Sequence, residues 1–68
     1  MTREEWIQAY AAKIGVEPPT REQINEVLDL AAAAAHGSEK TAAPLACWIA
    51  GLSGRPLADL RRAAEELE

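Results

Sequence analysis

Hydrophobic residues recur along this chain at intervals of three and four positions, the spacing of one face of an α-helix. In the first segment the residues at this spacing are Trp6, Ile7, Tyr10 and Ile14. Thr2 and Glu5 have the spacing of a capping box, and Gly15 can adopt the left-handed conformation that ends many helices. The pattern predicts a helix over residues 3–14.

Pro18 and Pro19 interrupt the helical pattern, because proline has no N–H group to donate within a helix. Thr20 and Gln23 then repeat the capping-box spacing. The longest apolar stripe of the chain follows, at Ile24, Val27, Leu28, Ala31 and Ala35. It predicts a helix over residues 21–36, and its alanine-rich second half favours a close crossing with another helix.

Pro44 and Pro56 each fit the first turn of a further helix, where a missing N–H costs little. The two stripes that follow them are Leu45, Trp48, Ile49 and Leu52, and Leu57, Leu60, Ala64 and Leu67. They predict helices over residues 43–53 and 56–67, with Gly54 as terminator of the first. Since strand-like alternation is absent, the sequence predicts an all-α fold, a compact four-helix bundle forming a single domain over residues 1–68.

The core of such a domain is expected to be thin. The chain has 68 residues, many of its apolar residues are alanine, and it contains no phenylalanine. Trp6, Tyr10 and Trp48, with a few aliphatic residues, are therefore expected to form the core. Domains of this size are marginally stable. We therefore expect a homodimer, or docking onto a partner, to add stability.

Charge and cysteine content narrow the functional classes. Seven basic and eleven acidic residues give a net charge of −4, which argues against binding to nucleic acid or to an anionic membrane. The single cysteine, Cys47, excludes an intramolecular disulfide and a cysteine-built zinc site. No signal-peptide pattern or apolar run of membrane-spanning length is present. We therefore expect a cytoplasmic protein.

The segment from His36 to Leu45 gathers the most distinctive residues. His36 is the only histidine, and a catalytic histidine needs a nucleophile and an orienting group. Ser38 is too close in sequence to be a persuasive nucleophile, and Cys47 lies in an apolar segment where a buried thiol is the commoner state. We expect no enzyme activity, no catalytic residue, no cofactor and no metal site.

Two interpretations of this segment remain open. In the first, His36 caps the helix over residues 21–36 and Gly37 ends it in the left-handed conformation. In the second, His36, Gly37, Lys40 and Pro44 form a corner that binds a small ligand or an anion, helped by the free N–H groups that open the next helix.

The segment Ala34-Ala35-His36-Gly37-Ser38-Glu39-Lys40-Thr41-Ala42-Ala43-Pro44-Leu45, together with Trp6-Ile7, resembles a family of small actinobacterial helical domains of unknown function. That family typically has an Ala-His-Gly-x-x-Arg-Pro-Ala-Ala-Pro-Leu core. The present chain carries Lys40-Thr41 in place of Arg-Pro. Members occur alone or fused behind a nucleotidyltransferase domain similar to molybdenum cofactor guanylyltransferase.

The resemblance implies a link to molybdopterin guanine dinucleotide synthesis. The chain lacks the glycine-rich nucleotide-binding loop of such a transferase, so the enzyme itself is excluded. The function expected is that of a non-catalytic accessory or protein-interaction module, with a nucleotidyltransferase as partner in trans. The alternative is a small-ligand or anion-binding protein that uses the corner from His36 to Pro44.

Overall fold

The computed structural model describes residues 1–67 and confirms the all-α fold class. Four helices follow one another along these residues, as predicted for a four-helix bundle: α1 (Arg3–Ile14), α2 (Arg21–Gly37), α3 (Ala42–Ser53) and α4 (Leu57–Glu65). No strand occurs within the described part of the chain.

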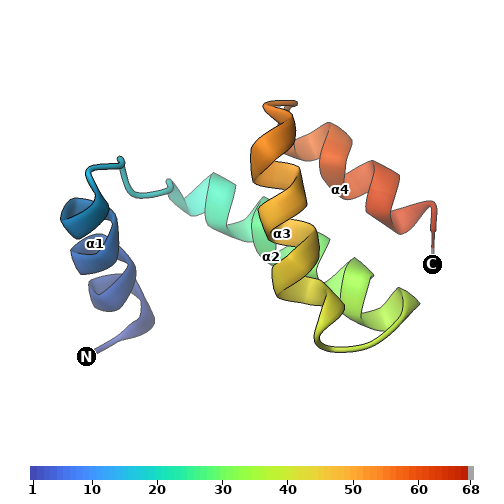
Figure 1. Cartoon of the computed structure of the whole chain (residues 1–68), viewed down its shortest axis with the longest axis horizontal. Helices are drawn as coiled ribbons and strands as arrows, with labels where there is room; N and C mark the ends of the chain where they lie inside the picture. The colour runs from blue at the N-terminus through green and yellow to red at the C-terminus, as the bar shows by residue number, and fades with distance from the viewer. Residues whose placement is uncertain (68) are drawn as a thin grey trace.

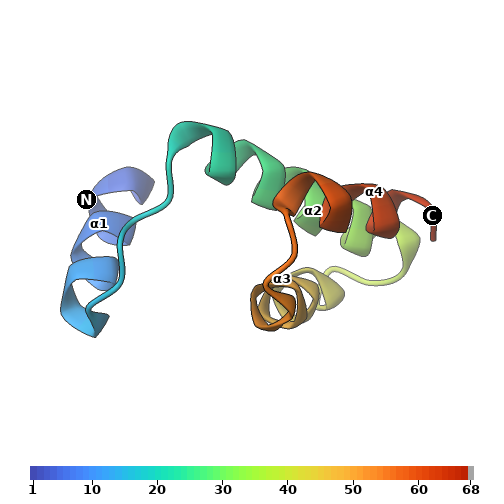
Figure 2. The same cartoon turned by 90° about the horizontal axis from the view of Figure 1, so that it is seen from above.

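α2 is the central element of the fold. Both α3 and α4 pack against it, and these are the two substantial contacts between helices in residues 1–67. Figure 1 shows α3 and α4 beside the second half of α2, whereas α1 stands at the opposite end of the molecule. In the view from above, α1 and α3 extend to the same side of α2 (Figure 2). The molecule measures 34 × 24 × 18 Å along its principal axes.

The two predicted capping boxes are present. At the start of α1 the N–H of Glu5 donates to Thr2 Oγ1 over 3.1 Å, and the Thr2 N–H donates to Glu5 Oε1 over 2.7 Å. Thr20 and Gln23 repeat both bonds at the start of α2. Each box satisfies N–H groups that have no partner within the helix. The bond to Thr2 also lowers the pKa of the Glu5 carboxyl, because it favours the ionised form.

Glycine ends two of the helices as predicted. Gly15 follows α1 with φ of 76°, and Gly54 follows α3 with φ of 68°. Gly37 differs from the prediction, since it is the last residue of α2 and does not have a positive φ. The end of α2 is stabilised instead by Ser38, whose Oγ donates to the carbonyl of Ala34 over 2.9 Å.

α4 is shorter than the predicted helix over residues 56–67. Pro56 is its N-cap rather than its first helical residue, and the helix ends at Glu65. Acidic side chains at a helix C-terminus oppose the helix dipole, which accounts for the early end at Glu65-Glu66. Between α4 and α2, Arg61 Nε donates to Glu26 Oε2 over 2.8 Å. Within α4, Arg61 Nη1 lies 2.9 Å from Glu65 Oε1.

The prediction that the large aromatic residues form the core is wrong. Trp6, Tyr10 and Trp48 are 53%, 49% and 69% exposed. Among the described residues, the buried hydrophobic side chains are those of three alanines, Ala11, Ala33 and Ala50, and of one larger residue, Leu30. The physical reason is that α2 and α3 contact each other through their alanine-rich sides, whereas α1 makes no substantial contact with another helix, so the large aromatic residues of α1 and α3 stay in solvent.

The alanine contact predicts sensitivity to added volume. We expect Ala50→Leu, at a buried position of α3, to destabilise the fold by about 1–3 kcal/mol, because overpacking forces side chains and backbone apart. In a domain of this size each kcal/mol corresponds to about 4–8 °C in Tm. Thermal denaturation followed by circular dichroism measures the change. Ala32→Leu is the matched control, since Ala32 is an exposed alanine on α2; equal Tm values for the two variants would contradict the tight contact.

Candidate interaction surface

The largest unusual feature of the surface is an apolar face on α3. Four side chains at i, i+3, i+4 and i+7 point away from α2 and are between 63% and 69% exposed: Leu45, Trp48, Ile49 and Leu52. We refer to these four residues as the α3 face. Contiguous apolar surface of this kind on a small domain is typical of a binding site for another macromolecule.

The α3 face is exposed because the other side of the helix is the one that packs. Ala50 is buried, and Ala43, Ala46 and Cys47 are half-buried. None of the twelve residues from Ala42 to Ser53 carries a charge. A free helix in water normally presents polar residues on its solvent side, so α3 has the composition of a helix that is covered on both sides.

A second exposed apolar region lies on α1. The rings of Trp6 and Tyr10 stack with their centroids 5.0 Å apart and an interplanar angle of 17°. Ile14, one turn beyond Tyr10, is 55% exposed. We refer to Trp6, Tyr10 and Ile14 as the α1 face. Stacked aromatic rings are rigid and lose little entropy on binding, which makes such pairs effective contact residues.

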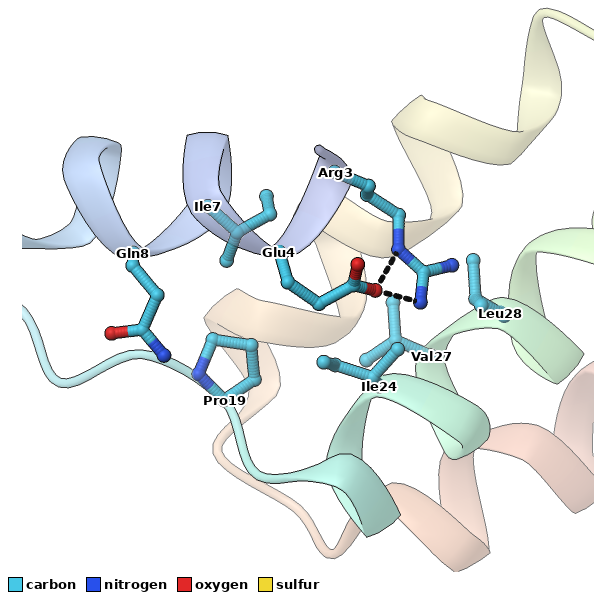
Figure 3. A pocket seen from close by; sticks show the side chains of 8 residues that line it. All are labelled: Arg3, Glu4, Ile7, Gln8, Pro19, Ile24, Val27 and Leu28. Atoms are coloured by element: carbon cyan, nitrogen blue, oxygen red, sulfur yellow. Dashed lines mark hydrogen bonds and ion pairs between the residues drawn. The ribbon is translucent and has the colours of Figure 1, made fainter. Parts of the chain in front are cut away.

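The side of α1 that is turned toward α2 borders a cavity of about 200 Å³ (Figure 3). Its walls are mainly aliphatic, and an ion pair between Arg3 and Glu4 forms part of its lining. The hydrogen bond from Arg3 lowers the pKa of the Glu4 carboxyl. The residues that line the cavity are Arg3, Glu4, Ile7, Gln8, Pro19, Ile24, Val27 and Leu28. Because its one carboxylate is paired, the cavity offers apolar surface rather than a catalytic group.

The predicted corner is exposed to solvent throughout. His36, Gly37, Lys40 and Pro44 all have exposed side chains or backbone. The neighbouring cavity, of about 240 Å³, is lined by Ala33, Ala34, Gly37, Ser38, Ala42, Ala46, Ala64 and Leu67. Of the four predicted residues only Gly37 contributes to it, so this cavity does not unite the imidazole of His36 with the ammonium of Lys40.

The backbone donors at the start of α3 are largely occupied. The Ala42 N–H donates to the carbonyl of Glu39 over 2.9 Å, and the Ala43 N–H donates to that of Lys40 over 3.2 Å. Pro44 has no N–H group. An anion at this helix start would therefore compete with two existing hydrogen bonds instead of meeting free donors.

Three further features of the described residues are the thiol of Cys47, the side chains that could hold a metal ion, and the length of the helices. Burial raises the pKa of the Cys47 thiol, which lowers its thiolate content at neutral pH. No three histidine, cysteine, aspartate or glutamate side chains gather to hold a metal ion within residues 1–67. In the same part of the chain, every helix is too short or too polar to span a bilayer.

The sequence pattern identified the residues of the α3 face as an apolar stripe, and the prediction assigned Trp48 to the core. The signal that could have placed them outside is the opposite side of the same helix. Ala43, Ala46 and Ala50 lie there, at positions three and four apart. The side of α3 with only small residues fits the alanine-rich stripe of α2, so the large side chains of α3 are left on the opposite side.

These features define a small all-α domain with two exposed apolar faces. The chain belongs to the family described as Domain of unknown function (DUF6457), whose sequence profile matches residues 1–68. No match was found among the curated proteins or among the solved structures. The description of the family names no activity.

The environment of Cys47 generates a prediction about its reactivity. Because burial raises the pKa of this thiol, we expect iodoacetamide to alkylate it several-fold more slowly at pH 8 than it alkylates free glutathione. Unfolding in urea is expected to remove the difference. Mass spectrometry of quenched samples gives both rates, and faster alkylation of the folded protein than of glutathione would identify Cys47 as an activated nucleophile instead.

Proposed function

We propose that this protein is a non-catalytic helical interaction module and that the α3 face is its contact surface. The observation that carries the proposal is the orientation of α3. The helix has no charged residue, and it turns Leu45, Trp48, Ile49 and Leu52 away from α2 with each more than 60% exposed. Keeping this much apolar surface in water is unfavourable by about 25 cal/mol per Å², so covering it supplies a driving force for association.

The first partner to test is a nucleotidyltransferase similar to molybdenum cofactor guanylyltransferase. This choice rests on the resemblance of the segment around His36-Gly37 and Ala42-Ala43-Pro44-Leu45 to actinobacterial domains that occur fused to such enzymes. A domain fused in one protein often corresponds to a separate partner in another. On this proposal the module acts in the cytoplasm and binds the transferase without taking part in its chemistry.

The α3 face supports this function better than the corner does. His36 and Lys40 are exposed and do not line the cavity beside them, and the N–H groups of Ala42 and Ala43 are already bonded. Trp48 stands at the centre of an apolar patch, and tryptophan is among the residues that contribute most to protein–protein binding. We therefore assign recognition to Trp48 and its three neighbours.

An affinity pull-down with mass spectrometry tests the proposal. The tagged protein, incubated with cytoplasm of its source organism, is expected to retain a nucleotidyltransferase. Trp48→Glu is expected to reduce the retained amount at least tenfold, because it places a charge at the centre of the contact.

Leu67→Glu is the matched control, since Leu67 is 84% exposed and lies outside the α3 face. Circular dichroism establishes that both variants keep their helices. Equal retention by Trp48→Glu and the wild type, or the absence of a nucleotidyltransferase from the retained proteins, would contradict the proposal.

A further inference from the structure

We infer that the free protein is a two-fold symmetric homodimer in which the α1 face of each copy covers the α3 face of the other. This inference rests on the proposed role of the α3 face as a contact surface and names its occupant in the absence of another partner. Each chain carries two apolar faces that its own fold leaves open, and a second copy carries the two faces that match them.

The position of α1 is the first argument. α1 makes none of the substantial helix contacts of the fold, and it is joined to α2 through the stiff segment that contains Pro18 and Pro19. It stands apart from α3 while extending to the same side of α2 (Figure 2). A helix held away from its own body in this way can reach the body of a second molecule.

The exposed area is the second argument. From the exposed fractions, and taking about 150–250 Å² for each large side chain, the α3 face leaves about 500 Å² in water. The α1 face, with Trp6, Tyr10 and Ile14 about half exposed, adds about 350 Å². A stable interface of standard size buries about 800 Å² on each partner. The α3 face alone falls short of this area, whereas the two faces together reach it.

Charge is the third argument. Two copies of a chain with a net charge of −4 repel each other, so a contact between them has to avoid acidic residues. Residues Ala42–Ser53 carry no charge, and the charged side chain in the lining of the hollow beside the aromatic pair is that of Lys13. The contact therefore brings no acidic side chain of α3 against the partner.

Symmetry completes the arrangement. A two-fold axis makes the contact of α1 with the partner's α3 occur twice, so all four apolar faces are covered and none remains to recruit a third chain. Pairing of one α3 face with another would leave both α1 faces exposed. The reciprocal arrangement is therefore the one that covers all four faces.

Sedimentation equilibrium of the purified full chain is the primary test. Over a series of micromolar concentrations we expect the apparent mass to rise from 7.3 kDa toward twice that value. Trp6→Glu and Trp48→Glu are each expected to weaken dimerisation at least tenfold, and Leu67→Glu is expected to leave it unchanged. A constant mass of 7.3 kDa, including the case in which α1 folds back onto α3 of its own chain, would overturn the inference.

A mixture of the two variants tests the pairing itself. A heterodimer of a Trp6→Glu chain and a Trp48→Glu chain has one intact contact, made by the α1 of the second chain and the α3 of the first. We expect the equimolar mixture to associate more strongly than either variant alone. If Trp6→Glu dimerises like the wild type, or if mixing restores nothing, the α3 faces do not pair with α1 of the partner.

The outcomes separate this inference from the proposed function. The Trp6→Glu variant keeps its α3 face and loses the copy that competes for it, so it should retain the nucleotidyltransferase at least as well as the wild type. A monomeric wild type that retains the transferase would overturn the dimer alone. A dimer that retains no transferase would support the inference and contradict the proposed partner.

Discussion

The contact of α2 with α3 through small side chains is the constraint on which the rest of the structure depends. Ala33 on α2 is 4% exposed and Ala50 on α3 is 8% exposed, and these two helices pack against each other. A helix that packs through alanine has nowhere inside the molecule for its large residues. The exposure of Trp48 and its neighbours is therefore a direct consequence of how α3 packs, and the proposed interaction surface follows from the same cause.

Local structure was largely readable from the sequence, because it depends on residues close together in the chain. Thr2 with Glu5 and Thr20 with Gln23 start their helices as predicted, and Gly15 and Gly54 end theirs. Gly37 was misplaced because Ser38 can satisfy the carbonyl of Ala34 with its hydroxyl, which lets the helix continue through the glycine. The hydroxyl of Ser38 thus stabilises the end of α2, where a left-handed conformation of Gly37 was expected to end the helix.

The arrangement of the helices was harder to predict from the sequence. Hydrophobic periodicity identifies a stripe of residues that is buried, but it does not indicate whether the same chain or another chain buries it. Leu45, Trp48, Ile49 and Leu52 have the spacing of a core stripe, and the prediction placed Trp48 in the core of its own chain. The structure places all four on the surface. The apolar spacing and the exposure agree if the stripe is covered by another chain, and this agreement links the sequence pattern to the proposed function.

The fluorescence of Trp48 in a Trp6→Phe variant, which makes Trp48 the only tryptophan, shows whether another chain covers the α3 face. At nanomolar concentration, in the isolated chain, we expect red-shifted emission and efficient quenching by acrylamide. At concentrations at which the chain dimerises, we expect a blue shift and protection from the quencher. Blue-shifted, protected emission at every dilution would show that α3 buries Trp48 within its own chain, so that no second chain is needed to cover it.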